Sequence, residues 1–432
     1  MGEDRFMGRL TLSSFQWMVF ILAGVIVAPV SVAFAYGFSA DQTAELLQRT
    51  FFVMGLTSLL QGLFGHKLPL MEGPAGLWWG VFLAYAGGAT VAGDQTAILS
   101  SLVLGLFVSG LLFIILAALN LIDHVKKLFT PTIIGTYLIL LILQLSGPFV
   151  EGILGAEGGT INGKVAICAL ITLVIAIVFS QLRIAFFKNY SVLLSLVIGW
   201  VLFAVMGIAG HSTAGQPVFS VPHWFAWGKP TFNLGVVITA ILTGLLLLTN
   251  LIASADAVKQ VVQPEKDESL RRTSFIMGLN QILSGLFPTI GGVPISGSAG
   301  FILTTRIKDR LPFLIGSLII LILSFFPVIM GFFAALPAPV GYATLFISMA
   351  GIIGLGLQSL KGELHNEKKV TVVCLSIMAG TGILLLPQSA LQGLPSVLSS
   401  LLHNGLVVGV VIAVILDQLI GRAPKRSEIN NR

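Results

Sequence analysis

Three acidic residues stand out because they interrupt or border long apolar stretches: Glu72, Asp256 and Asp417. Glu72 is followed at once by Gly73-Pro74, a pair that does not continue a regular helix. An enclosed carboxylate at this position could carry a proton, or it could accept hydrogen bonds from nearby backbone N–H groups. Glu72 is the first candidate for binding a proton that is coupled to function, and Asp256 is the second. The spacing of three residues between Asp256 and Lys259, however, favours an ion pair at a helix end.

Polar and aromatic side chains inside apolar segments are the next candidates. Asn250 and Ser254 are four residues apart and therefore share one face of a helix. The Asn250 amide can donate and accept hydrogen bonds, which suits the edge of a heterocyclic base or, equally, an interhelical contact. Trp17 and Trp78 could stack on a planar ligand, or pack in the core as most buried indoles do.

One local pattern occurs twice in the chain. The first copy consists of 59–64, Leu68-Pro69 and 73–76, and the second consists of 282–287, Val293-Pro294 and 297–300. Each copy predicts an apolar helix, then a stretch that cannot be helical, and then a glycine-rich segment in which a second apolar helix begins. Pro131 and Gly135 recur later as Pro337 and Gly341 at the same spacing. Matched helix breaks in two halves of an apolar chain are typical of secondary transporters and indicate the substrate site.

The two breaks predict half-helix N-termini that face one cavity. Pro74 suits the first position of the restarting helix, and Ser298 suits an N-cap. Such ends offer N–H groups and a partial positive charge to carbonyl oxygens or delocalised negative charge. The expected substrate-binding residues are Trp17, Gly73, Pro74, Ala75, Gly76, Asn250, Ser254, Ser296, Gly297, Ser298 and Ala299.

Composition restricts the class of protein. Hydrophobic residues make up 56% of the chain and charged residues 10%, whereas soluble proteins contain roughly 25% charged residues. The chain is therefore expected to be an all-α polytopic protein of the lipid bilayer. No cluster of nucleophile, base and metal ligands predicts an enzyme, and neither a cofactor, a metal nor a nucleic-acid partner is indicated.

The apolar runs predict fourteen transmembrane segments. We place them near 14–36, 46–65, 73–89, 96–119, 131–150, 163–181, 190–209, 232–256, 272–288, 297–305, 312–334, 338–358, 370–387 and 400–421. With both termini cytoplasmic, only Arg49, Lys164 and Lys229 of the 24 lysines and arginines fall in outer segments. Asp417 then lies at the interface near Arg422. Seven spans separate the two copies, which predicts a 7+7 inverted repeat with spans 3 and 10 broken by short extended stretches.

Four further parts of the sequence form a recognisable set: Ser14-Phe15-Gln16-Trp17 with Ala28-Pro29, Leu68-Pro69 with Gly73, 254–259 and 300–306. Together they resemble the nucleobase–ascorbate transporter family, or nucleobase:cation symporter family 2, which includes bacterial uracil and xanthine permeases. The resemblance covers nearly the whole chain in layout. It implies a core domain of spans 1–4 and 8–11 (1–125 and 229–335). It also implies a gate domain of spans 5–7 and 12–14 (126–228 and 336–432, with a cytoplasmic tail).

The chain departs from this family where the family reads its substrate. Leu246 takes the place of a glutamate of span 8, Gly297 that of a carboxylate or glutamine of span 10, and Trp17 that of a histidine. The resemblance implies a secondary active permease of the cell membrane that imports a nucleobase such as xanthine, urate or uracil by proton symport. It also allows a homodimer through the gate domain. The alternatives are an anion or aromatic-acid transporter of the sulfate or benzoate type on the same fold, and a non-transporting membrane receptor.

Overall fold

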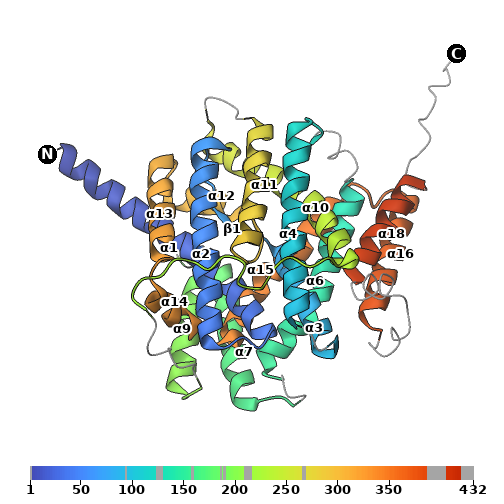
Figure 1. Cartoon of the computed structure of the whole chain (residues 1–432), viewed down its shortest axis with the longest axis horizontal. Helices are drawn as coiled ribbons and strands as arrows, with labels where there is room; N and C mark the ends of the chain where they lie inside the picture. Colours follow the sequence, from blue (N-terminus) through green and yellow to red (C-terminus); the bar gives the residue numbers. More distant parts are fainter. Residues whose placement is uncertain are drawn as a thin grey trace. The chain divides into compact units, whose positions relative to one another are not determined.

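The fold is known from a computed structural model of the whole chain (Figure 1). The structure describes residues 2–92, 95–122, 130–156, 160–184, 187, 191–208, 217–264, 269–386 and 405–419. Fifteen helices and one two-stranded sheet make up this part of the chain. The expected cytoplasmic tail, with Arg422, lies outside the described residues.

A helix lies at the place of each predicted segment within the described residues, although the first helix begins twelve residues before the expected start at 14. In the first half the helices are α1 (Gly2–Ala35), α2 (Ala40–Phe64), α3 (Gly76–Ala92), α4 (Gln95–Ala118), α6 (Pro131–Leu154), α7 (Gly163–Gln181) and α9 (Ser191–Val205). In the second half they are α10 (Leu234–Val262), α11 (Leu270–Leu286), α12 (Gly297–Thr305), α13 (Arg310–Leu323), α14 (Pro327–Ala334), α15 (Ala338–Leu360), α16 (Glu367–Leu384) and α18 (Gly405–Leu419).

The structure confirms the prediction that the protein is mainly helical and has apolar helices long enough to cross a membrane. Six described helices are long and apolar enough to cross a bilayer, and a seventh crossing is possible if α13 and α14 act together. These two helices occupy the place of the eleventh predicted segment and are bent by 90° at the break between them. Pro327 at the start of α14 explains the break, because it cannot donate the backbone hydrogen bond that a continuous helix needs. The full number of crossings stays a prediction.

Helix α2 begins earlier than the hydrophobic pattern predicts. Ser39 and Gln42 form a capping box, in which each side chain bonds the backbone N–H of the other residue. The helix therefore starts at Ala40, and Arg49 lies in its third turn with 2% of its surface exposed. Arg49 is therefore a buried residue of the helix, and its expected place toward the outer side of the membrane stays a prediction.

The chain divides into two compact units, and each is described by itself. The first contains 1–122 and 147–347. Within it, α13, α2, α11 and α4 stand side by side in that order (Figure 1). Helix α1 packs against α13 and α2, and α10 packs against α4. This unit holds both helix breaks and every predicted site residue.

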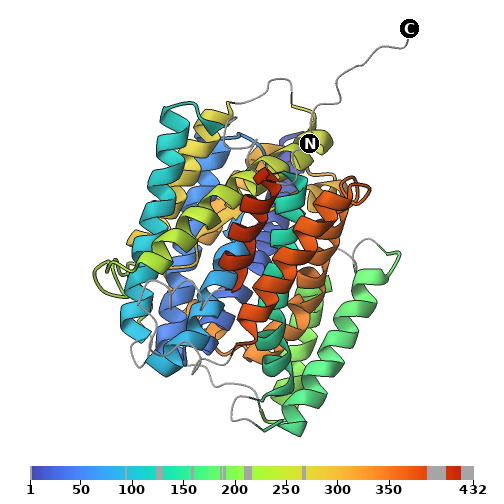
Figure 2. The same cartoon turned by 90° about the vertical axis from the view of Figure 1, so that its right-hand side faces the viewer.

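The second unit contains 123–146 and 348–432, with α16 and α18 lying side by side (Figure 2). Asp417 of α18 is 2% exposed, and its carboxylate binds the Lys369 ammonium at 2.5 Å and the Thr130 hydroxyl at 2.9 Å. Asp417 is therefore enclosed by protein, and its expected position at the interface near Arg422 stays a prediction, because Arg422 lies outside the described residues. Burial of a carboxylate requires a partner of opposite charge, and Lys369 supplies it.

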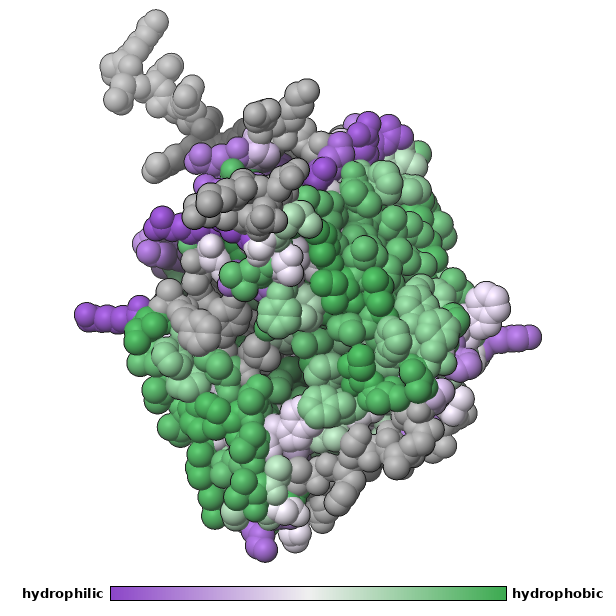
Figure 3. Space-filling view, turned by 90° about the vertical axis from the view of Figure 1, so that its left-hand side faces the viewer, coloured by the Kyte–Doolittle hydropathy of each residue, from purple (hydrophilic) through white to green (hydrophobic). Residues whose placement is uncertain are grey.

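Apolar side chains also cover much of the outer surface. On the face shown in Figure 3, hydrophobic residues form a broad area, and hydrophilic residues gather at its margins. In the first unit, Leu111 of α4, Phe275 of α11, Leu303 of α12 and Leu318 of α13 are 45–65% exposed. Exposed apolar surface on neighbouring helices is unfavourable in water and favourable against lipid tails.

Candidate functional site

The two helix breaks cross each other inside the first unit. The strands β1 (Glu72–Pro74) and β2 (Gly292–Pro294) pair in antiparallel register, with Glu72 opposite Pro294 and Gly73 opposite Val293. Two backbone hydrogen bonds extend the pair: Ala75 N–H donates to Gly291 O at 2.8 Å, and Ile295 N–H donates to Met71 O at 2.9 Å. All six strand residues are buried. The pairing satisfies backbone groups that neither water nor a helix reaches at this depth.

The duplicated motif correctly predicts that the two helix breaks lie together. It aligns the wrong residues of the two breaks with each other. Each strand ends in proline, at Pro74 and Pro294, so Pro74 is the counterpart of Pro294 and the expected match of Pro69 with Pro294 is wrong. The reason is the length of the connection from helix to strand, which is longer in the first copy (65–71) than in the second (287–291). Proline suits the strand end because it has no N–H to offer to the pairing.

The starts of the following helices also differ from the expectation. Gly73 lies in β1, Pro74 ends it, and α3 begins only at Gly76, so Pro74 is not the first helical residue. The residue at the N-cap of α12 is Ser296, whose side chain makes no capping bond. Ser298 lies inside α12, where its hydroxyl accepts a hydrogen bond from Met71 N–H at 3.2 Å. Ser298 therefore links the two breaks, which is why it is fully buried.

Two helix side chains hold the strands from equivalent positions. Gln61 and Ser284 occupy the same position in the two copies of the motif. Ser58 of α2 lies three residues before Gln61, and Gln281 of α11 lies three residues before Ser284, so these two residues are also equivalent. The Ser58 hydroxyl accepts from Glu72 N–H at 2.9 Å, and the Gln281 amide donates to Gly292 O at 2.6 Å. The same Gln281 amide accepts from the Trp78 indole N–H at 2.7 Å. Trp78 is thus engaged in holding the crossing.

Glu72 is the first residue of β1 and has no exposed surface. Its Oε2 accepts from the Asn280 amide at 2.9 Å, and Asn280 Oδ1 accepts from the Ser284 hydroxyl at 3.3 Å. Its Oε1 has no hydrogen-bond partner among the described residues. Gly292 lies against the same amide, since a Cβ there would stand 2.7 Å from Asn280 Nδ2. One carboxylate oxygen is therefore held in place, and the other is available to bind a proton.

The accessible part of the crossing is the start of α12. Ser296 and Gly297 are exposed, whereas Ala75, Ser298 and Ala299 are buried. A Cβ on Gly297 would meet only Ile295 at 3.6 Å and Phe20 at 3.8 Å, both of them ordinary contacts. The N-terminal end of α12 therefore opens onto free space beside the Phe20 ring.

The other predicted site residues lie in different surroundings. Trp17 has no exposed surface and is enclosed by the rings of Phe20, Phe301 and Phe313, at centroid distances of 5.8, 4.5 and 5.2 Å. Gly76 and Asn250 are half-buried, and the Asn250 amide oxygen accepts from the Ser254 hydroxyl at 3.0 Å. The second proton candidate, Asp256, is exposed on α10 and lacks the enclosure of Glu72.

Sequence reasoning missed Ser58, Asn280 and Gln281. Each is a polar residue inside an apolar helix, and all three are fully buried. This could have identified them, because a buried polar group needs a partner. Their partners lie in β1, β2 and α3, however, and only the folded chain reveals them.

We expect that Gln281→Leu destabilises the crossing. The change removes two hydrogen bonds and leaves the Trp78 indole N–H and Gly292 O buried without partners, at a cost of about 1–3 kcal/mol for each group. Thermal unfolding of the detergent-solubilised protein should show a lower midpoint. The exposed Gln260 on α10 provides the control, and an equal midpoint for Gln281→Leu and Gln260→Leu would contradict the assignment.

Comparison with known proteins identifies the family. Residues 8–389 match the model Xan_ur_permease, which describes a permease family. A Bacillus subtilis (strain 168) protein named "Putative purine permease YwdJ" is 40% identical over 420 residues, which cover 95% of this chain and 96% of that protein. The uric acid permease PucJ of the same organism is 24% identical over 96% of this chain and 93% of its own length, and its xanthine permease is 24% identical over 95% and 93%.

Solved structures show the same fold at low identity. The transmembrane domain of the cyanobacterial bicarbonate transporter BicA has a TM-score of 0.62 at 18% identity, over 94% of this chain and 97% of that one. Murine Slc26a9, an anion transporter solved in its inward-facing state, has a TM-score of 0.61 at 12% identity, over 95% and 68%. The chain is a multi-pass membrane transporter that belongs to the permease family, which confirms its resemblance to the nucleobase–ascorbate transporters.

Proposed function

We propose that the protein is a secondary active permease that imports a nucleobase, such as xanthine, urate or uracil, by proton symport. The observation that carries the proposal is the β1–β2 crossing, where two helix breaks from distant parts of the chain pair inside one compact unit. Paired breaks of this kind form the substrate sites of secondary transporters. Relatives along the full length of the chain are named for purines, uric acid and xanthine.

The substrate site in this proposal lies at the open start of α12. The base stacks on the half-buried Phe20 ring and places its carbonyl edge at the exposed backbone of Ser296 and Gly297. The Asn250 amide donates a further hydrogen bond from α10, because its oxygen already accepts from Ser254. Gly73, Pro74, Ala75, Gly76, Ser298 and Ala299 shape the site from the crossing. Trp17 contacts the Phe20 ring edge to face, and Phe301 stacks on Phe20 at 4.5 Å, so the base would use the other face of that ring.

Glu72 is the coupling residue in this proposal. Its neutral form fits the enclosed crossing, because an isolated charge without a partner is costly inside a membrane protein. Its ionised form needs a conformation that opens the crossing to water. A proton bound at Oε1 would therefore favour one state of the transporter, and its loss would favour the other.

Topology and domains complete the proposal. The chain crosses the cell membrane fourteen times with both termini in the cytoplasm, as a 7+7 inverted repeat. Its core domain consists of 1–125 and 229–335, and its gate domain of 126–228 and 336–432 moves against the core and provides a homodimer contact. The antiparallel pairing of β1 with β2 supports the inverted direction of the two halves.

Transport by the full chain in proteoliposomes tests the function. Radiolabelled xanthine, urate, hypoxanthine, uracil, benzoate and sulfate are offered under an inward proton gradient, with and without an uncoupler. We expect accumulation of at least one base and a collapse of that accumulation with the uncoupler. Accumulation of benzoate or sulfate alone would favour the anion transporter, and absence of any flux would favour the receptor.

Labelling of single cysteines tests the topology. In a chain with Cys168 and Cys374 replaced by alanine, Lys229→Cys should react with an impermeant maleimide from outside the cell. Lys368→Cys should react only after the membrane is opened, because it precedes an expected cytoplasmic end of a span. Reaction of both from the same side would contradict the fourteen-span model.

A further inference from the structure

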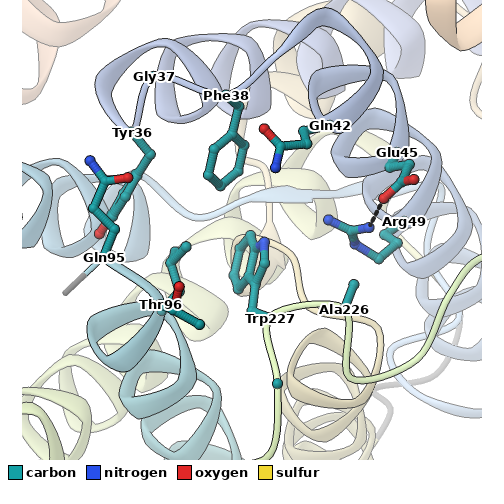
Figure 4. Close-up of a pocket in the computed structure, with 12 residues that line it drawn as sticks. Tyr36, Gly37, Phe38, Gln42, Glu45, Arg49, Gln95, Thr96, Ala226 and Trp227 are labelled. Carbon is teal, nitrogen blue, oxygen red and sulfur yellow. Dashed lines mark hydrogen bonds and ion pairs between the residues drawn. The ribbon is translucent and has the colours of Figure 1, made fainter.

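A cavity lies where α1 ends and where α2 and α4 begin. Its volume is about 290 Å³, and its walls come from these three helices and from the segment at Trp227 (Figure 4). None of the residues at the β1–β2 crossing lines it. Under the proposed topology this end of the helices faces the outside of the cell.

The cavity has a buried floor and an exposed rim. Tyr36, Arg49 and Trp227 at the floor are 2–7% exposed. At the rim, Gln42, Gln95 and Ala226 are exposed. A concave site lined by aromatic side chains with a few polar groups is typical of small-molecule sites, although the volume here is just below the usual range of roughly 300–1,000 Å³. Its occupant should therefore be smaller than a drug molecule.

Arg49 gives the floor its chemistry. Its Nε donates to Pro288 O at 2.8 Å, and its Nη1 lies 3.5 Å from the Glu45 carboxylate. Among the described residues these contacts use two of the five N–H donors of the guanidinium. The guanidinium also stands 5.8 Å from the centre of the Trp227 ring. A guanidinium that is anchored on one side can present its remaining donors to a ligand in fixed positions.

The aromatic groups favour a planar ligand. The rings of Phe38 and Trp227 are 6.5 Å apart and tilted by 54°, so they do not stack on each other. The Arg49 guanidinium lies over one face of the Trp227 ring, and both rings line the cavity, where a planar ligand can pack against them. Figure 4 shows both rings and the Arg49 side chain around the same space. Bases stack on aromatic side chains and on guanidinium planes, and stacking is worth about 1–3 kcal/mol for each base in nucleic-acid complexes.

The charges favour a neutral ligand over a strong anion. Glu45 places a negative charge beside the positive charge of Arg49, so the two nearly cancel. The Gln95 amide offers both a donor and an acceptor, and the Gln42 amide offers its NH₂ group, because its oxygen already accepts from Ser39 N–H. An alternating edge of N–H and C=O groups matches this set, and such an edge is what a nucleobase presents.

The floor is also linked to the crossing. Arg49 bonds Pro288, and the Thr50 and Thr289 hydroxyls are hydrogen-bonded at 2.5 Å, so α2 is tied twice to the segment that leads into β2. The Trp227 ring lies 5.5 Å from Phe82, which lies 6.4 Å from Trp78. A ligand on the floor therefore contacts residues that are packed onto the crossing.

We propose that this cavity is a second binding site for the transported base, a position where the base is held before it reaches the crossing. The proposal rests on the proposed function for the identity of its ligand. It does not rest on the site at Gly297, because the two sites share no residue.

Equilibrium dialysis of radiolabelled xanthine with the purified full chain tests the second site. Ala226→Trp fills the cavity from its exposed rim and leaves Arg49 and Trp227 in place. Val221→Trp is the matched control, because Val221 lies in the same segment, is 61% exposed and does not line the cavity. Gly297→Leu blocks the site at α12. We expect two molecules bound by the wild type and by Val221→Trp, and one by Ala226→Trp and by Gly297→Leu.

Each other outcome has a defined meaning. A single molecule that is lost in Gly297→Leu and kept in Ala226→Trp would overturn the second site and leave the proposed function intact. A single molecule that is lost in Ala226→Trp and kept in Gly297→Leu would overturn the site at α12 and support the cavity. Binding of no xanthine by the wild type would overturn xanthine as the ligand of both sites.

Discussion

Replacing Gly297 by leucine is expected to abolish uptake while the protein still folds and reaches the membrane. Gly297 is the first residue of α12 and is exposed, and a Cβ there has room, with its nearest neighbours at 3.6 and 3.8 Å. The larger side chain therefore does not force the protein apart. It extends into the space beside Phe20 that we assign to the substrate. Radiolabelled uptake and the yield of folded membrane protein should be measured together.

Two matched variants separate blockage from general damage. Gly297→Ala adds only the Cβ, which makes ordinary contacts, so it should retain substantial uptake. Gly163→Leu places the same large side chain at the first residue of another helix, α7, where a Cβ meets nothing within 4 Å. It should leave uptake unchanged. Full uptake by Gly297→Leu would show that the substrate does not pass the start of α12.

Much of this arrangement could be predicted from local sequence. The duplicated motif predicts that two non-helical segments meet, and β1 and β2 do pair. The basis is simple: proline and glycine prevent regular helix, and backbone groups freed inside an apolar protein must find each other. The helix positions follow from apolar runs whose length is set by the bilayer.

The details of the crossing could not be predicted in the same way. The segment 65–76 contains several prolines and glycines, so local rules permit more than one strand register. The actual register depends on contacts between residues more than 200 positions apart, such as Met71 N–H with Ser298 and Asn280 with Glu72. Trp17 shows a similar limit, because an indole in an apolar helix has the same sequence signal whether it meets a ligand or three phenylalanines.

The position of Arg49 at the floor of the cavity could not be predicted for another reason. Basic residues near a span end are usually assigned to the water phase. The capping box at Ser39 starts the helix several residues before the predicted position, and the packing of α2 places Arg49 in the interior against Pro288 and Trp227. A short-range signal, the capping box, thus overrides the hydrophobic pattern at this end of α2.

Replacing Glu72 by glutamine is expected to eliminate proton-driven accumulation while exchange of substrate across the membrane continues. Glutamine has the size of glutamate, and its amide oxygen can accept the Asn280 hydrogen bond that Glu72 Oε2 accepts at 2.9 Å. Its NH₂ group takes the place of Oε1, which has no partner among the described residues. The crossing should therefore keep its structure, since the neutral amide resembles the protonated carboxyl group. It loses only the ability to release and bind a proton.

Two transport assays and one control variant decide the role of Glu72. Counterflow of labelled base in proteoliposomes measures exchange, and net uptake under an inward proton gradient measures coupling. Asp256→Asn is the control, because Asp256 is exposed on α10 and should support accumulation without its charge. If Glu72→Gln loses counterflow as well, the carboxylate serves to hold β1 against α11. If it keeps pH-dependent accumulation, proton coupling belongs elsewhere. Loss of accumulation alone identifies Glu72 as the proton carrier, because only ionisation distinguishes the two side chains.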